Sequence, residues 1–359
     1  MTIKNFASRS LAVAVATLSL ASCSAGSHVS PAVSAAGAVR RMAGFGQLRG
    51  GRSYLVAAKS NAHGHIEHFK QWMEPGAVKN RLLYVSDFSA NIVQVYNYPS
   101  QGSQNPPAGT LTGFSNPQGM CVDSSSNVLI ANTGGENVLQ YPYGGTSPTA
   151  TYNDSGEYPV GCSVDPTSGY VAISDIFSPT TGEGAVTICT STSSCTTYVE
   201  PGGLLECYFI AYVPSGDLYV VGLNASGVAM AYLPHGSTVW QPATIEGSSV
   251  VFPGQLQYAG GYLVVGDQSG SGGSTLYRCS PSGSVVDCNS GSTVLEGAEV
   301  VQWFIKRGIK GVTGADNSNK VESTWAYPAG GSMRPNKTFT VDDGTYSTLE
   351  GNAVVLPPH

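Results

Sequence analysis

Short apolar runs that each end in a small acidic or amide turn recur along this chain. Five copies are clear and the fourth in order is degenerate: LLYVSD (82–87), VLIAN (128–132), YVAISD (170–175), LYVVGLN (218–224), LVVGD (263–267) and GVTGAD (311–316). Runs of this length, bounded by turn residues, are typical of buried strands. Asp87 and Asp316 are 229 positions apart, which makes five intervals of about 46 residues. The pattern therefore predicts an array of β repeats.

Each repeat contains four strand-like pieces. In the second repeat these pieces begin at Pro117, Asn127, Asn137 and Thr149, and the third repeat restarts at Pro159. The first pieces of both repeats share the pattern P-x-G-x-x-V-D. Four strands in a period near this length correspond to one blade of a β-propeller.

The two ends of the array complete each other. The first repeat begins directly at Leu82 and lacks a P-x-G-x-x-V-D piece, whereas the final LEGNAVV (349–355) matches the x-x-G-x-x-V part of that pattern. A C-terminal strand that joins the first blade would satisfy sheet edges that an open array exposes. We therefore predict an all-β fold: a six-bladed β-propeller of four-stranded antiparallel blades over residues 81–359, closed by the C-terminal strand.

Two segments, VSDFSANIVQVY (85–96) and IANTGGENVLQY (130–141), resemble NHL-type repeats. The similarity runs from Leu82 to the C-terminus and is sharpest in the first three repeats. Propellers of the NHL-like type include binding scaffolds and lyases, and related six-bladed folds include calcium-dependent lactonases and esterases. The resemblance implies a fold without choosing among these functions.

The N-terminus has the features of an export signal. Lys4 and Arg9 precede an apolar stretch from Leu11 to Ala21, and the sequence Leu20-Ala21-Ser22-Cys23 follows at once. This ending resembles the bacterial lipobox, so we predict a lipoprotein signal peptide over 1–22, lipidation of Cys23 and a flexible tether and leading segment over 23–80. The alternative is an ordinary secretory signal with a chance cysteine. Both place the mature chain outside the cytoplasm, and the predicted lipid anchor would hold it in the bacterial cell envelope.

Charge is distributed unevenly along the chain. No Lys or Arg occurs between Leu82 and Tyr277, and residues 81–359 contain 8 basic and 21 acidic residues. An acidic body repels phosphate backbones, which disfavours a nucleic-acid partner. The basic segment before it could lie against anionic headgroups beside a lipid anchor, or could be a solvated linker. The expected partners are the membrane and a protein or glycan ligand, and the chain is expected to be a monomer.

The cysteine pattern predicts disulfides. Apart from Cys23, four of the eight cysteines form two local pairs, Cys189 with Cys195 and Cys279 with Cys288, each across a turn. In an oxidising compartment both pairs would clip the third strand of a blade to its fourth.

Three cysteines then remain. Cys162 and Cys207 are expected on neighbouring blades, and we predict that they pair. Cys121 is left without an assigned partner. No C-x-x-C motif accompanies these residues, so they do not indicate a metal site.

The acid or amide that ends each apolar run has two interpretations. Such residues commonly accept hydrogen bonds from the backbone amides of their own turn, which every blade needs. A catalytic ring is the less favoured alternative. The clear copies of this position are Asp87, Asn132, Asp175, Asp267 and Asp316.

A second set of oxygen-bearing residues lies where the innermost strands begin, near the predicted mouth of the central channel. The set comprises Asn116, Glu157, Glu206, Glu299 and Glu350. Calcium takes six to eight oxygen ligands of this kind. A calcium ion held there would polarise an ester or lactone carbonyl.

Two hypotheses follow for the function. The first is a non-catalytic, lipid-anchored propeller that binds a protein or a glycan. The second is a calcium-dependent hydrolase or lyase with its site at the channel mouth. Neither His235 nor His359 lies in a G-x-S-x-G context, so the sequence assigns no catalytic residue.

Overall fold

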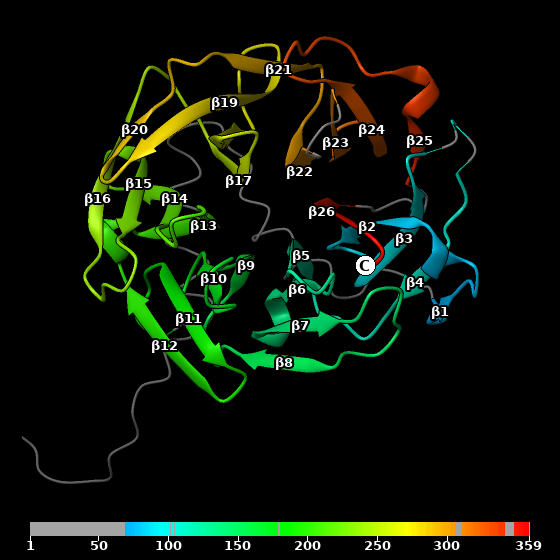
Figure 1. Cartoon of the computed structure of the whole chain (residues 1–359), viewed down its shortest axis with the longest axis horizontal. Helices are drawn as coiled ribbons and strands as arrows, with labels where there is room; N and C mark the ends of the chain where they lie inside the picture. Colours follow the sequence, from blue (N-terminus) through cyan, green and yellow to red (C-terminus); the bar gives the residue numbers. More distant parts are fainter. Residues whose placement is uncertain are drawn as a thin grey trace, which may run out of the picture. The chain divides into compact units, whose positions relative to one another are not determined.

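The computed structural model describes residues 69–358, apart from residues 101, 104, 179, 306–309 and 342–347. Its described residues form β-strands and four short 3-10 helices, η1 (Ala77–Lys79), η2 (Thr133–Gly135), η3 (Pro201–Gly203) and η4 (Pro335–Lys337). None of these helices is long and apolar enough to cross a membrane. The strands form a ring of mostly antiparallel sheets (Figure 1).

The first sheet joins both ends of the ring. Its strands, in spatial order, are β1 (Trp72–Met73), β4 (Gly109–Leu111), β3 (Ile92–Tyr98), β2 (Arg81–Asp87) and β26 (Leu349–Val355). Strand β1 pairs with β4, so the sheet reaches back into the segment that the sequence assigned to the lead-in.

Two four-stranded antiparallel sheets follow in chain order. The second sheet contains β5 (Pro117–Val122), β6 (Val128–Asn132), β7 (Asn137–Tyr141) and β8 (Ala150–Asn153). The third contains β9 (Pro159–Val164), β10 (Val171–Asp175), β11 (Ala185–Ser191) and β12 (Ser194–Val199).

A nine-stranded sheet contains two antiparallel groups. The first group is β13 (Glu206–Tyr212), β14 (Leu218–Asn224), β15 (Gly227–Leu233) and β16 (Gln241–Glu246). The second is β17 (Pro253–Ala259), β18 (Tyr262–Asp267), β19 (Gly273–Ser282) and β21 (Ser292–Glu296). Strand β20 (Val285–Asp287) pairs antiparallel with β19 and parallel with β16, and so connects the two groups.

The last sheet contains β22 (Val300–Ile305), β23 (Gly311–Asp316), β24 (Val321–Ala326) and β25 (Phe339–Thr340). The innermost strands contact one another in the order β26, β5, β9, β13, β17 and β22, and β22 contacts β26 again. Figure 1 shows these strands around the centre of the ring.

The apolar runs of the sequence are strands that are buried on both faces. In β2, Leu82 and Tyr84 pack against the second sheet, whereas Leu83 and Val85 pack against the last sheet. Successive side chains of a strand point to opposite faces, so a strand between two sheets needs apolar residues at every position. The core therefore consists of apolar layers between neighbouring sheets.

The glycine of the P-x-G pattern lies where innermost strands approach closely. A Cβ atom at Gly119 would overlap the carbonyl oxygen of Val160, and one at Gly351 would overlap the carbonyl oxygen of Gln118. Each contact joins the innermost strands of two neighbouring sheets. Glycine therefore recurs at this position because the neighbouring innermost strand is too close for a Cβ atom, and not because a turn requires it.

The C-terminal strand closes the ring as predicted. Strand β26 pairs antiparallel with β2, with Leu82 opposite Val355 and Val85 opposite Asn352. Gln302 of β22 adds polar links, because its Oε1 accepts hydrogen bonds from the backbone amides of Asn352 and Met120 at 2.8 and 2.9 Å. Strands β22, β26 and β5 are therefore joined by one side chain.

Both predicted local disulfides are present, Cys189–Cys195 and Cys279–Cys288. The first joins the third and fourth strands of its sheet, as expected. The second instead holds the hairpin of β19 and β20, because the strand that completes that sheet is β21.

The predicted pairing of Cys162 with Cys207 is wrong. Cys162 is bonded to Cys121, and Cys207 is a buried free thiol. Cys162 and Cys121 belong to the apolar layer between the second and third sheets, whereas Cys207 belongs to the layer between the third sheet and β13 to β15. The Cys162 side chain thus points to the opposite face of its strand from the one facing Cys207. Three disulfides among the described residues indicate folding in an oxidising compartment.

Candidate functional site

The five predicted calcium ligands lie at corresponding positions of the ring. Each precedes or begins an innermost strand: Asn116 at β5, Glu157 at β9, Glu206 at β13, Glu299 at β22 and Glu350 at β26. Within the part of the chain that the structure describes, however, no three Asp, Glu, His or Cys side chains gather as a metal ion would require. The predicted joint ligand set is not assembled, and among its five members only Glu299 and Glu350 interact with each other.

Asn116 and Glu206 each form a hydrogen bond with a residue outside the predicted ligand set. The Asn116 amide donates to the carbonyl oxygen of Phe88 at 3.2 Å, and its backbone adopts a left-handed φ of 54°. Glu206 Oε2 accepts a hydrogen bond from the Tyr208 hydroxyl at 2.7 Å. Burial raises the pKa of Glu206.

Glu299 and Glu350 belong to the adjacent strands β22 and β26. Burial raises the pKa of Glu350 to about 8, and the negative charges of Glu299 and Asp87 add to that rise while Lys320 opposes it. Glu299 Oε2 accepts a hydrogen bond from the Ser318 hydroxyl at 2.8 Å. These carboxyl groups interact through their charges without the remaining predicted ligands.

The turn-acceptor interpretation is confirmed for three of the strand-ending acids. The backbone amide two residues further on donates to Asp87, Asp267 and Asp316 at 2.9, 3.0 and 3.0 Å. Asn132 also accepts a backbone hydrogen bond, from Ser115 at 2.6 Å. Asp87, Asp267 and Asp316 therefore hold their own turns, whereas Asn132 holds the loop that precedes β5.

Asp175 is the exception among these acids. Its side chain is fully buried and accepts a hydrogen bond from the Thr187 hydroxyl at 3.2 Å. With Asp154 and Glu157 it forms a buried carboxyl cluster, and one oxygen of each of the three lacks a donor. The carboxyl groups of Asp154 and Asp175 are within hydrogen-bonding reach of each other.

Burial favours the protonated form of each carboxyl group in the cluster. Burial raises the pKa of Asp175 well above its ordinary value, and the nearby Asp154 charge adds to this rise. Burial also raises the pKa of Asp154 and raises that of Glu157 to about 7. Two ionised carboxylates cannot hydrogen-bond to each other, because both are acceptors only. If Asp175 is protonated, its hydroxyl group can donate a hydrogen bond to Asp154, which gives a partner to the unpaired oxygen of each residue.

Sequence reasoning assigned Asp175 to turn formation, although a signal against this was present. Asp87, Asp267 and Asp316 are each followed two positions later by a serine, whereas the corresponding residue after Asp175 is Phe177. The loop between β10 and β11 is also long. The changed turn releases the Asp175 carboxyl group for contact with Asp154.

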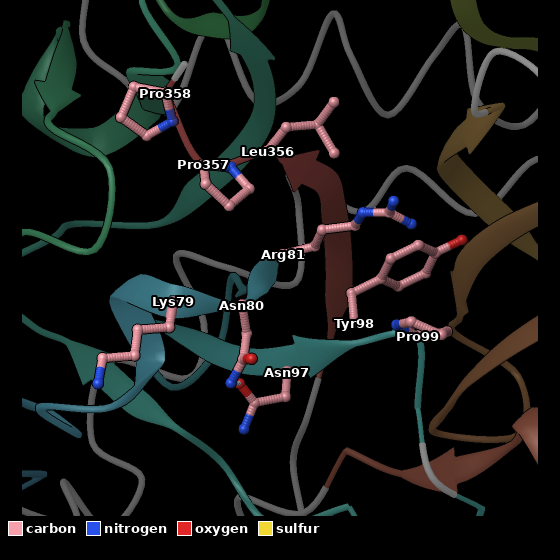
Figure 2. A pocket seen from close by; sticks show the side chains of 9 residues that line it. All are labelled: Lys79, Asn80, Arg81, Asn97, Tyr98, Pro99, Leu356, Pro357 and Pro358. Atoms are coloured by element: carbon pink, nitrogen blue, oxygen red, sulfur yellow. Dashed lines mark hydrogen bonds between the residues drawn. The ribbon is translucent and has the colours of Figure 1, made fainter.

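A cleft lies near the opposite end of β26, where the ring closes. It has a volume of about 700 Å³, and its lining residues come from η1, β2, β3 and the tail after β26: Lys79, Asn80, Arg81, Asn97, Tyr98, Pro99, Leu356, Pro357 and Pro358. We call it the seam cleft. Figure 2 shows the Arg81 side chain beside the Tyr98 ring. The Asn80 amide donates to Asn97 Oδ1 at 2.9 Å.

Comparison with known proteins gives a fold but no family. No family model and no curated protein matches the chain. A chain in the crystal structure of a nidogen/laminin complex is similar, with a TM-score of 0.55 and 14% identity over 78% of this chain and 99% of that one. The fold is β-propeller-like.

A second similar structure is a functionally unknown protein from Desulfotomaculum acetoxidans DSM 771. Its TM-score is 0.50 at 12% identity, and the match covers 80% of this chain and 88% of that one. Identities this low concern the fold alone, so the function must be argued from the residues of this chain.

Proposed function

We propose that this protein is a six-bladed β-propeller that is anchored by a lipid outside the cytoplasm and acts as a binding scaffold for a protein or glycan. The blade count is supported by dividing the nine-stranded sheet at β20, which leaves two groups of four strands. Together with the other four sheets they make six. The closed cycle of innermost strands agrees with this count.

The seam cleft is the observation that carries the binding function. Its lining offers amide groups, cationic groups, an aromatic ring and prolines. Apart from Lys79 and Tyr98, its lining contains none of the residue types that commonly act as nucleophile or general base. Such a surface is suited to holding a ligand rather than to transforming it.

A similar solved structure and the three disulfides also support the proposed extracytoplasmic binding scaffold. The nidogen/laminin structure is that of a protein complex, so a ring of this type occurs in a binding assembly. The three disulfides fit a protein that works in an oxidising compartment. A scaffold also benefits from a closed ring, because rigid elements hold binding groups in place without a large entropic cost.

The lipid anchor rests on the Leu-Ala-Ser-Cys sequence that ends at Cys23, which lies outside the described residues. The test is to express Cys23→Ser beside the natural chain and to separate membrane and soluble fractions. The substituted protein should move to the soluble fraction. Equal membrane retention of the two proteins would contradict the anchor.

The scaffold function is tested with the purified full-length chain in detergent. Binding to purified envelope glycans and to an array of envelope proteins is measured by interferometry, with and without a calcium chelator. The same samples are incubated with a panel of lactones and esters. Saturable binding that survives chelation, without turnover, is the expected result. Turnover that disappears on chelation would contradict the scaffold and favour the calcium-dependent hydrolase.

A further inference from the structure

We infer that the seam cleft binds a saccharide that bears a carboxylate group. This inference rests on the proposed scaffold function and deepens it by naming a ligand class and a site. Three observations support it: the charge of the cleft, the polar and apolar side chains that line it, and the complete backbone pairing of β2 beside it.

The first step concerns charge. The cleft contains two cationic side chains, Lys79 and Arg81, and no acidic one, although residues 81–359 carry 21 acidic and only 8 basic residues. Lys79 and Arg81 are two positions apart in the chain, and ring closure adds the uncharged wall of Leu356, Pro357 and Pro358 beside them. A positive cleft in an acidic body attracts anionic groups selectively to that place.

Both cations are available to a ligand. Lys79 and Arg81 are exposed, and within the described part of the chain neither forms an ion pair. Burial and then the charge of Glu322 raise the pKa of Tyr98 to about 12, and the Arg81 charge opposes this rise, so Arg81 lies close enough to act on Tyr98. A guanidinium held beside an aromatic ring presents its free edge for bidentate contact with a carboxylate.

The remaining lining groups suit a sugar ring. Asn80 and Asn97 offer amide donors and acceptors for hydroxyl groups, and their mutual hydrogen bond orients both. Tyr98, together with Pro357 and Pro358, offers flat apolar surface for the C–H face of a pyranose. The volume of about 700 Å³ lies within the range of small-ligand sites.

The backbone around the cleft favours a saccharide over a peptide. Extended peptides commonly bind by adding a strand to an open sheet edge. Here β2 is paired on both sides, with β3 and β26, and the cleft lies at strand ends. Lys337 Nζ also donates to the carbonyl oxygen of Ser100 at 2.8 Å, which fixes the loop after Tyr98. The site therefore presents side chains rather than an unpaired backbone.

The test uses isothermal titration of the full-length chain with trigalacturonic acid and with its methyl ester, which keeps the hydroxyl groups and loses the charge. The acid should bind, and the ester should bind at least about 10-fold more weakly. Arg81→Gln should weaken binding of the acid by about 10- to 100-fold, because a hydrogen bond to a charged group is lost. Lys79→Gln should weaken it less.

Lys70→Gln is the matched control, because it removes the same charge at an exposed position that does not line the cleft. Circular dichroism and melting temperature verify that each variant is folded. Equal loss of affinity in Lys70→Gln and Arg81→Gln would overturn the inference, as would equal binding of acid and ester or no binding of the acid. Tighter binding to vesicles of anionic phospholipid, abolished by Arg81→Gln, would overturn it in favour of a headgroup site.

Failure of this inference differs from failure of the scaffold function. If Arg81→Gln leaves binding to envelope glycans or proteins unchanged, the scaffold stands and its ligand site lies elsewhere. If the natural chain turns over an ester or lactone only when calcium is present, the scaffold function itself fails.

Discussion

Replacing Glu322 by glutamine should remove a pH-dependent loss of stability. Glu322 lies on β24 and is 1% exposed. Its carboxyl oxygens accept hydrogen bonds from the Thr313 hydroxyl at 2.6 Å and from the Asn352 amide at 2.8 Å. Asn352 belongs to the closing strand β26, so this carboxyl group connects the last sheet to the first.

Burial of Glu322 determines the sign and the size of the change in unfolding free energy with pH. Burial raises the pKa of Glu322 from 4.5 to about 8. A carboxyl group whose pKa is raised in the folded state contributes its full stability below about pH 4.5 and loses it as the pH rises through about 8. At about 1.4 kcal/mol for each pH unit, the loss approaches 5 kcal/mol above pH 8.

Glutamine has the same shape and stays neutral. The Asn352 side-chain oxygen has no donor, so a rotated Asn352 amide can accept from the new Gln amide. We expect Glu322→Gln to have nearly the same unfolding free energy as the natural chain at pH 5. At pH 8.5 the variant should be more stable by several kcal/mol.

The assay is urea unfolding at both pH values with disulfides intact, followed by tryptophan fluorescence. Trp303 and Trp325 are buried in the last sheet and report its unfolding. Exposed Glu246→Gln is the control and should give the same small difference at both pH values. If Glu322→Gln also gives equal differences at both, Glu322 does not carry a buried proton and the reasoning is refuted.

Further predictions concern the strand-ending acids and the disulfides, which the same unfolding assay tests, and the closing strand. At pH 8, Asp175→Asn should raise the unfolding free energy, because an amide replaces the proton shared with Asp154. Asp267→Asn should lower the unfolding free energy by about 1–3 kcal/mol, since Asp267 accepts three backbone hydrogen bonds. If both substitutions changed the unfolding free energy in the same direction, the proposed difference between Asp175 and Asp267 would be contradicted. Replacing Cys121 and Cys162 by serine should cost about 4 kcal/mol, against about 2 for the Cys189–Cys195 pair, because the closed loops span 41 and 6 residues; equal costs would contradict this. Deleting residues 349–359 removes a fully buried strand and should leave no soluble folded protein on size-exclusion chromatography.

The order of the strands could be predicted from the sequence because burial on both faces leaves a strong signal. A run such as Leu82 to Val85 has no polar position, and the turn acid that follows it marks the strand end. The match between residues 349–355 and the missing first strand also gave the closure, which the pairing of β26 with β2 confirms.

Features that depend on side-chain direction could not be predicted as well. The pairing of Cys162 depended on which face of β9 its side chain occupies, and one position decides this. The contact between Asp154 and Asp175 depended on a loop whose turn departs from the other repeats. The five predicted calcium ligands have corresponding positions, yet apart from the pair Glu299 and Glu350 they interact with residues outside the set, so a shared position did not imply a shared site.

The seam cleft was missed for a different reason. Its residues come from the start of the ring, near Lys79, and from the tail that begins at Leu356. Neither segment carries a motif, and the two meet only after the ring closes. The predicted closure brings the two segments together, but no motif in either of them marks a cleft.

Strand β20 has a consequence for how the protein avoids self-association. The outer strand of a sheet presents unpaired backbone groups, which are a template for another chain. Strand β20 pairs with the outer edge of β16, with Thr244 opposite Val285 and Glu246 opposite Asp287. The Cys279–Cys288 bond holds the hairpin of β19 and β20. Reduction of this bond should loosen the β20 hairpin and uncover the outer edge of β16, so the oxidised state keeps this edge paired.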